Sequence, residues 1–414
     1  MDLQLMGKRA VTAKYELQSM SSSQKKEALL FIADRLIKDA SLLLEKNEID
    51  IKEAQKNQMH PGMIDRLKLN RERIEAIAQG IIQVAGLQDP IGEVIEEILR
   101  PNGLKILKMR VPIGVIGIFY ESRPNVTADA FALCFQTGNA VILKGGSDAL
   151  YSNKAITDCI RSALVESKIN PDCIQLIETT DRETAKAFMK LDQFVDLLIP
   201  RGGAGLIRSV KENSTIPVIE TGTGNCHIFV DESADLEKAV AILINSKTQR
   251  IGVCNACESL LIHEAIAEWA LPILGKALQE KQVEIRGDET TMHFLPFAIL
   301  ATEEDYGKEF LDFIISVKVV KNLEDAIAHI NQYNTKHSDA IITQNQENAE
   351  KFLREVDAAC VYVNAATRFT DGFMFGFGAE IGISTQKIHA RGPMGLKELT
   401  SYKYMIYGDG QIRE

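Results

Sequence analysis

Residues 115–119 read Val115-Ile116-Gly117-Ile118-Phe119, a short apolar run that precedes a helical pattern at 127–136. Three further runs of this kind, at 140–143, 174–177 and 195–199, also have helical segments between them. Short apolar strands that alternate with helices are typical of a parallel sheet whose two faces are both covered. These runs therefore predict an α/β domain.

A second α/β series follows residue 226. Its predicted strands lie at 227–230, 259–263, 297–300 and 314–320, and its predicted helices at 235–248 and 323–332. The chain has 414 residues, which exceeds the size at which one hydrophobic core keeps growing. The residues before 104 are predicted to be mainly helical, with a capped amphipathic helix from Ser21 to about Glu45. The predicted fold class is α/β, with two domains built on parallel-rich sheets.

Two strand candidates, 104–111 and 399–407, fall outside this alternation. The first alternates apolar and basic residues, and the second is isolated although it is rich in β-forming residues. Because an unpaired strand edge invites association, we expect the two segments to pair with each other or with a neighbouring subunit.

Composition excludes several classes of protein. The formal net charge of −10 argues against a general nucleic-acid binder, which carries an excess of Lys and Arg on one face. No apolar run approaches the roughly 20 residues that span a bilayer, so we expect no membrane partner. Seven scattered cysteines do not make a disulfide framework, and the start lacks a signal-peptide pattern. The sequence predicts a soluble protein of the reducing cytoplasm.

The candidate nucleophile is Cys254, in the polar turn 249–258, Gln-Arg-Ile-Gly-Val-Cys-Asn-Ala-Cys-Glu. A cysteine on such a turn can be exposed, and the charge of Arg250 would lower the thiol pKa. Two alternatives remain at this point. Cys254 could be a small buried residue, or it could form a redox or zinc pair with Cys257, although no second ligand pair with zinc spacing is present.

Three strand ends carry candidate binding residues, although no G-x-G-x-x-G fingerprint follows a strand. Arg201-Gly202-Gly203 lies between a strand and a helix and could offer backbone N–H groups to a phosphate. Lys144-Gly145 repeats this position on an earlier strand, and the Asn125 amide could donate to an oxyanion. The alternatives are a tight turn for the glycines, a solvated lysine, and a helix N-cap for Asn125.

Taken together, these stretches resemble the gamma-glutamyl phosphate reductases, a family of the aldehyde dehydrogenase superfamily that works in proline biosynthesis. The resemblance covers nearly the whole chain. Its most specific parts are 120–127 (Tyr-Glu-Ser-Arg-Pro-Asn-Val-Thr), 199–203 (Ile-Pro-Arg-Gly-Gly), 220–227 (Glu-Thr-Gly-Thr-Gly-Asn-Cys-His), 249–258, 367–372 and 375–382.

The resemblance implies an enzyme that reduces gamma-glutamyl phosphate with NADPH to glutamate 5-semialdehyde and phosphate through a cysteine thioester. Cys254 matches the nucleophile, Asn125 the oxyanion amide, and Lys144 the lysine that meets the adenosine ribose or its phosphate. Glu309 matches a glutamate that holds the nicotinamide ribose, but it lacks the superfamily's neighbouring glycine-proline pair. The chain also has Ile251 where the family usually has proline.

The implied organisation is aldehyde dehydrogenase-like. It comprises a cofactor-binding domain (1–103 and 113–226), a catalytic domain (227–366), and an oligomerisation arm (104–112 and 394–414). The cofactor side is assigned Lys144, Gly145, Arg201, Gly202, Gly203, Glu220 and Glu309. The small-molecule substrate is assigned Arg123, Arg368 and Arg391, because guanidinium binds phosphate and carboxylate bidentately.

We expect no metal site and a homo-oligomer, a dimer or larger, and the upstream glutamate kinase is a candidate partner. Two rival functions stay open. One is an aldehyde dehydrogenase that hydrolyses its thioester, with Glu220 as the residue that activates water. The other is an inactive protein that keeps the fold and serves in NADPH binding or assembly.

Overall fold

The computed structural model describes residues 2–413, which form two compact units. Unit 1 contains the described residues up to Glu220, the segment Gly376–Gly382, and those from Met394 onward. Unit 2 contains Thr221–Phe375 and Ile383–Pro393. The division after Glu220 precedes the boundary at 226 that the sequence predicted, and unit 1 also takes up 376–382, which the predicted domains left unassigned.

The helices of unit 1 are α1 (Leu3–Gln18), α2 (Ser22–Lys38), α3 (Ala40–Lys56), α4 (Pro61–Leu67), α5 (Arg71–Gly86), α6 (Asn125–Gln136), α7 (Leu150–Glu166), α8 (Arg182–Phe188) and α9 (Ala204–Asn213), with 3-10 turns η1 (Ser147–Ala149), η2 (Pro171–Cys173) and η5 (Lys397–Leu399). Its strands are β1 (Val94–Leu99), β2 (Lys105–Pro112), β3 (Val115–Tyr120), β4 (Ala140–Gly145), β5 (Ile174–Leu176), β6 (Leu197–Arg201) and β16 (Thr400–Tyr407).

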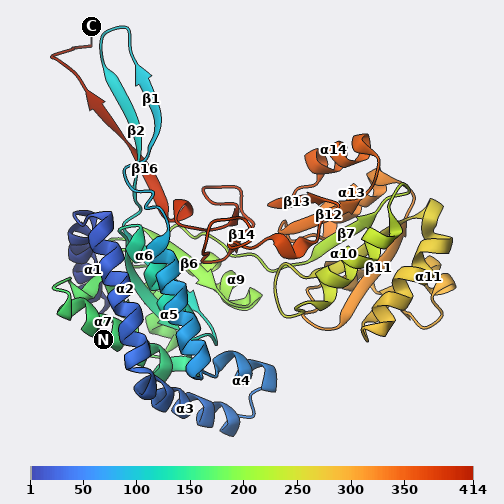
Figure 1. The fold of residues 1–414 in the computed structure, drawn as a ribbon, viewed down its shortest axis with the longest axis horizontal. Coiled ribbons are helices and arrows are strands. Elements are labelled where there is room, and N and C mark those ends of the chain that lie inside the picture. The colour runs from blue at the N-terminus through green and yellow to red at the C-terminus, as the bar shows by residue number, and fades with distance from the viewer. Residues whose placement is uncertain (1, 414) are drawn as a thin grey trace. The chain divides into compact units, whose positions relative to one another are not determined.

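The central sheet of unit 1 is parallel, with strand order β5-β4-β3-β6. All six residues of β3 are buried, because helices such as α1, α6 and α9 pack against the sheet (Figure 1). The register pairs Tyr120 with Gly145 on one side and with Arg201 on the other. The carboxyl ends of β4, β3 and β6 therefore lie at one edge, which brings together three motifs that are far apart in sequence.

The antiparallel sheet of unit 1 has the order β1-β2-β16 and projects from the helices (Figure 1). β16 pairs with β2 along its whole length, from Thr400 opposite Pro112 to Tyr407 opposite Lys105, which is the first of the two pairings that the sequence left open. β1 was not predicted, and the proposed domains placed it with the cofactor-binding residues. Its central Glu96 and Glu97 are both exposed, so the strand lacks the alternation of apolar and polar residues that marks a half-buried strand.

The helices of unit 2 are α10 (Leu236–Thr248), α11 (Glu264–Glu280), α12 (Glu289–Phe294), α13 (Leu323–Tyr333) and α14 (Gln346–Glu355), with 3-10 turns η3 (Glu303–Gly307) and η4 (Thr367–Phe369). Its strands are β7 (Cys226–Val230), β8 (Cys257–His263), β9 (Glu284–Gly287), β10 (Ile299–Leu300), β11 (Ile314–Val320), β12 (Ser338–Ile342), β13 (Cys360–Val363), β14 (Ile383–Ser384) and β15 (Gly392–Pro393).

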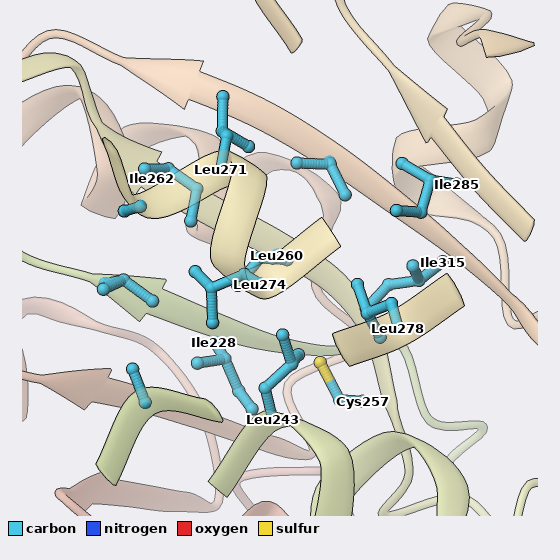
Figure 2. Packing of buried hydrophobic residues seen from close by; sticks show 14 of the residues in the cluster. Ile228, Leu243, Cys257, Leu260, Ile262, Leu271, Leu274, Leu278, Ile285 and Ile315 are labelled. Carbon is cyan, nitrogen blue, oxygen red and sulfur yellow. The ribbon is translucent and has the colours of Figure 1, made fainter. Parts of the chain in front are cut away.

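The main sheet of unit 2 is also parallel, with strand order β10-β9-β11-β8-β7-β12-β13. Its core packs α10 and α11 onto one region of the sheet, with Leu243, Leu274 and Leu278 against Ile228 and Leu260 (Figure 2). Burial of these side chains contributes the main stabilising energy, because each removes a large apolar area from water.

The helix predicted from Ser21 to about Glu45 is two helices, α2 and α3, in the structure. Ser21 caps α2 through a capping box with Gln24, which confirms the predicted start. The helix α2 ends at Lys38, and α3 begins at Ala40. Between them, the carboxylate of Asp39 accepts a hydrogen bond from Arg35 Nε of α2. No helix among residues 2–413 is both long and apolar enough to cross a membrane.

Candidate active site

Cys254 lies in the loop that joins α10 to β8 in unit 2. It is half-buried, whereas the other six cysteines are buried. The loop packs closely against the chain before β7, because a Cβ added to Gly224 would lie 1.4 Å from the Cys254 carbonyl oxygen. The same oxygen accepts a hydrogen bond from the Cys226 thiol at 3.2 Å. The backbone of the candidate nucleophile is therefore fixed by a glycine contact and by a buried thiol.

A second segment, 367–370, holds the other side of this loop. Thr367 Oγ1 donates to the carbonyl oxygen of Asn255 at 2.7 Å, and Asn255 Nδ2 donates to the carbonyl oxygen of Thr370 at 2.9 Å. These bonds link the residue after Cys254 to a segment more than a hundred positions later. Both segments carry motifs that are visible in the sequence, but their contact depends on the fold.

Arg368 belongs to the same cluster. Its Nε donates to Gln249 Oε1 at 2.8 Å, and its Nη1 donates to Asn255 Oδ1. Burial and the neighbouring charge of Arg250 lower the pKa of Arg368, and the charge of Cys254 also acts on it. Unit 2 thus brings two guanidinium groups to the cysteine loop, an arrangement that favours a thiolate.

Cys257 faces away from this chemistry. Its sulfur points into the hydrophobic core beside Leu243 and Leu278 (Figure 2), and its thiol donates to the Ser259 carbonyl oxygen at 3.4 Å. Burial raises the pKa of Cys257 to about 12, so this thiol stays protonated. Within the described part of the chain, no group of three or more His, Cys, Asp or Glu side chains is arranged to hold a metal ion.

A buried ion pair supports the loop and was missed from the sequence. Lys247 Nζ and Glu258 Oε2 are 2.5 Å apart, and both side chains are 0% exposed. Burial raises the pKa of Glu258 to about 7, while Lys247 opposes that shift. The second carboxylate oxygen accepts from the backbone N–H of Leu311 at 3.2 Å. From sequence alone, Lys and Glu side chains are expected to be exposed to solvent. The pair can therefore be identified only from the structure, in which both side chains are buried.

Glu309 lies two residues before Leu311, whose backbone N–H bonds to Glu258. Its Oε1 accepts from the backbone N–H of Gly224 at 2.7 Å, and burial raises its carboxyl pKa although the Gly224 bond opposes the shift. Because Gly224 also contacts Cys254, the structure brings Glu309 into the same neighbourhood as the nucleophile. Its predicted role with the nicotinamide ribose stays a prediction.

Arg391 lies in a different cluster of unit 2, around Asp357. Its Nη2 is 2.7 Å from Asp357 Oδ1, and Lys336 and Lys387 approach the other carboxylate oxygen at 2.5 and 2.8 Å. The two lysines and the arginine hold the pKa of Asp357 well below its usual range. A substrate anion at Arg391 would have to compete with this carboxylate.

In unit 1, Lys144 is the last residue but one of β4, at the edge where the three motifs meet. Its side chain is mostly buried, its Nζ donates to the Gly145 carbonyl oxygen at 3.0 Å, and burial lowers its pKa. A solvated lysine is therefore excluded. Gly145 leaves no room for a side chain, because an added Cβ would lie 2.3 Å from Asn153 Nδ2.

The glycines after Arg201 lead into α9 and already hold an anionic group. The carboxylate of Glu121 accepts from the backbone N–H of Gly203 at 2.9 Å, and a Cβ added to Gly202 would lie 2.4 Å from the same oxygen. A carboxylate at a helix N-terminus occupies the position that suits a phosphate. The segment therefore fits an anionic group, and Glu121 is a residue that sequence reasoning missed.

Asn125 is the first residue of α6, and Pro124 is its N-cap, so the helix N-cap alternative for Asn125 is wrong. Its side chain instead donates from Nδ2 to Asp129 Oδ2 at 2.8 Å. Arg123 lies just before it and is half-buried. Glu220, the last residue of the first segment of unit 1, forms an ion pair with Lys211 of α9 at 2.8 Å.

The chain matches a protein-family model described as the aldehyde dehydrogenase family over residues 1–293 and 307–405. It is 57% identical over 412 residues to the gamma-glutamyl phosphate reductase of Lachnospira eligens, which covers 100% of this chain and 99% of that protein. The protein of the same name from Caldanaerobacter subterraneus is 55% identical over 414 residues, with 100% of both covered.

Solved structures agree with these matches. The crystal structure of gamma-glutamyl phosphate reductase from Thermotoga maritima gives a TM-score of 0.98 at 51% identity, with 100% of both chains covered. An acetylating aldehyde dehydrogenase from Geobacillus thermoglucosidasius gives a TM-score of 0.69 at 16% identity, covering 100% of this chain and 99% of that one, and shares the fold alone.

Proposed function

Because the chain belongs to the gamma-glutamyl phosphate reductases of the aldehyde dehydrogenase family, we propose that it reduces L-glutamate 5-phosphate to L-glutamate 5-semialdehyde and phosphate in proline biosynthesis. The membership confirms the resemblance and the α/β fold class predicted from the sequence. The observation that carries the proposal is the full-length match at 57% identity, to which unit 2 adds one half-buried cysteine beside two arginines.

The chemistry begins at Cys254. Its thiolate attacks the acyl carbon of the substrate, the C–S bond forms as the C–O bond to phosphate breaks, and a thioester remains. Arg368, whose charge interacts with that of Cys254, and Arg250 in the same turn as Cys254 would favour the thiolate through their positive charge. Asn125 is the candidate donor to the oxyanion, and loss of one such donor typically costs roughly 3 kcal/mol of transition-state stabilisation.

The family implies a nicotinamide cofactor, and the residues present fit one. The N-terminus of α9 at Gly203 already accommodates a carboxylate, and the backbone at Gly202 has no room for a side chain. Gly145, Arg201 and Lys144 lie at the same edge of the sheet. When bound, the reduced cofactor would supply the hydride that converts the thioester into the aldehyde.

NADPH is the form we propose, because Lys144 and Arg201 place two positive charges at this edge of the sheet, and positive charge favours an additional ribose phosphate. Replacing Lys144 with Ala should weaken NADPH more than NADH, because only NADPH loses a charge-assisted contact. The dissociation constants of both cofactors measure this. An equal change in the two would show that Lys144 does not contact the additional phosphate.

The reverse reaction provides the test of the whole proposal. If phosphate leaves in the biosynthetic direction, microscopic reversibility requires phosphate to cleave the thioester when the aldehyde is oxidised. Purified protein given glutamate 5-semialdehyde and NADP should therefore produce NADPH only when phosphate is present. An undiminished rate without phosphate, with free glutamate as product, would establish the hydrolytic dehydrogenase instead.

The ion pair of Glu220 with Lys211 supports the phosphate-dependent reaction. The hydrolytic rival needs Glu220 as the base that activates water, and an ion-paired carboxylate is less available for that role. Replacing Glu220 with Gln should therefore leave the phosphate-dependent rate within a few-fold of the original. A large loss would give Glu220 a direct part in the reaction.

We also propose that the arm formed by β1, β2 and β16 makes a dimer or a larger oligomer. Tyr402, Tyr404 and Ile406 of β16 are at least half exposed, and apolar side chains on an exposed strand favour association. Deleting residues from Thr400 onward should reduce the mass in solution, and an unchanged mass would refute this. The cytoplasm is the proposed compartment, because the seven scattered cysteines do not make a disulfide framework.

A further inference from the structure

Asp129 lies one helical turn after Asn125 on α6, and the two side chains are hydrogen-bonded. Residues four positions apart face each other on a helix, and here Asn125 Nδ2 is 2.8 Å from Asp129 Oδ2. An ionised carboxylate has acceptor oxygens only, so it binds the amino side of an amide and repels the carbonyl side. The contact therefore selects one of the two orientations that the Asn125 amide could adopt.

The orientation matters because the amide nitrogen carries two N–H groups. One N–H is held by Asp129, and the other remains to donate elsewhere. If the amide turned over, its carbonyl oxygen would occupy the donor position and would repel a developing oxyanion. We propose that Asp129 is the positioning residue that holds the Asn125 amide with its second N–H free to serve as the oxyanion donor, an inference that rests on the function proposed above.

The surroundings of Asp129 support this role. The backbone of α5 passes close by, since a Cβ added to Gly80 would lie 3.6 Å from Asp129 Oδ1. Burial raises the pKa of Asp129 to about 6, while its hydrogen bond from Asn125 and the charge of Arg201 on β6 oppose the shift. Arg201 on β6 is thus a charged group whose field reaches this carboxylate. Below pH 6 a protonated Asp129 would present a donor, and its preference for the amino side would be lost.

The test compares Asn125→Ala, Asp129→Ala, Asp129→Asn and the double alanine variant, all as full-length protein. Asn125→Ala should lower kcat by about 100- to 1000-fold, as loss of one oxyanion donor does. Asp129→Ala should lower kcat at least ten-fold with little change in KM, because the amide is then free to turn. Asp129→Asn should recover most of that loss, because the new side chain has a carbonyl oxygen that accepts from Asn125 Nδ2.

The double variant and the pH profile separate positioning from simple structural support. If Asp129 acts through Asn125, the double variant should be no slower than Asn125→Ala. The fall in kcat near pH 6 should also be reduced in Asp129→Asn, which does not titrate. Asp158→Ala, at a surface aspartate on α7 that contacts Lys154, is the matched control and should retain wild-type kcat.

The outcomes distinguish the inference from the function on which it rests. Wild-type kcat in Asp129→Ala, with a large loss in Asn125→Ala, would overturn the inference alone. Additive losses in the double variant would also overturn it, because Asp129 would then act independently. If Asn125→Ala is fully active, both the oxyanion role and the inference fail. If Asp129→Ala does not fold, the Asp129→Asn pH profile decides, and an unchanged acid limb would refute positioning.

Discussion

Replacing Lys247 with Met should destabilise unit 2 and weaken the support beneath the cysteine loop. The ammonium and the Glu258 carboxylate are 2.5 Å apart with neither side chain exposed, so removing Lys247 leaves a buried carboxylate without its counter-ion. Breaking a buried pair in this way costs about 3–5 kcal/mol. For a domain of this size, each kcal/mol lowers Tm by roughly 2–4 °C, so the expected decrease is about 6–20 °C.

The expected loss depends on pH, and its sign follows from Glu258. Burial already raises the pKa of this carboxyl to about 7, and without Lys247 it should rise further. A raised carboxyl pKa means that the folded protein binds the proton more tightly, so stability falls as pH rises through the folded pKa. The difference between variant and wild type should therefore be smaller at pH 6 than at pH 8.

The assay is thermal unfolding at both pH values, with Lys238→Met as control. Lys238 lies on the same helix, α10, but is 64% exposed and pairs only loosely with Asp235 at 3.5 Å, so its loss should change Tm by at most 1–2 °C. A second variant, Lys247→Met with Glu258→Gln, should recover part of the loss because no charge remains buried. Equal Tm values for Lys247→Met and Lys238→Met would refute the reasoning.

Three further outcomes follow from the described geometry. Cys254→Ala should lower kcat by several orders of magnitude, whereas Cys257→Ala should be mild because that thiol packs in the core; comparable losses in steady-state assays would overturn the assignment. Glu121→Ala should tighten cofactor binding about two- to five-fold by calorimetry, since a competing carboxylate leaves the α9 N-terminus; unchanged affinity would exclude the competition. Burial lowers the pKa of His329 and of His337 to about 3. Stability should therefore fall as pH drops from about 6.5, by roughly 2 kcal/mol per histidine at pH 5, and His329→Phe should reduce that slope in urea unfolding; an identical slope would contradict it.

The fold could be predicted where strands are buried on both faces and therefore read as apolar runs. β12 escaped prediction because it begins with Ser338 and Asp339, two polar residues that are fully buried. Their hydrogen bonds come from other parts of unit 2, for example from the backbone N–H of His227 to Asp339 Oδ1 at 2.9 Å. A sequence pattern assigns polar residues to the surface, so strands of this kind need the tertiary partners to be known.

In the candidate site as well, some residues can be predicted from the sequence, whereas the contacts between them depend on the fold. Cys254 and Asn125 are predicted from the chemistry of their residue types and from motif resemblance. Arg368 is predicted to be a substrate ligand, but its contacts with Gln249 and Asn255 join segments that lie more than a hundred residues apart in the sequence. Asp129 did carry a signal, since it lies four positions after Asn125 in a predicted helical segment. That signal becomes usable only when the helix is known to begin at Asn125 rather than after it.

Six of the seven cysteines are buried, and this has a practical consequence for work on the protein. Burial raises the thiol pKa of Cys134, Cys159 and Cys173, and those of Cys226 and Cys257 as well. A maleimide or iodoacetamide dye applied to the folded wild-type chain should therefore attach at Cys254 in preference to any other position. The number of dye molecules per chain would then count competent active sites in a preparation, without any cysteine having to be removed by mutagenesis.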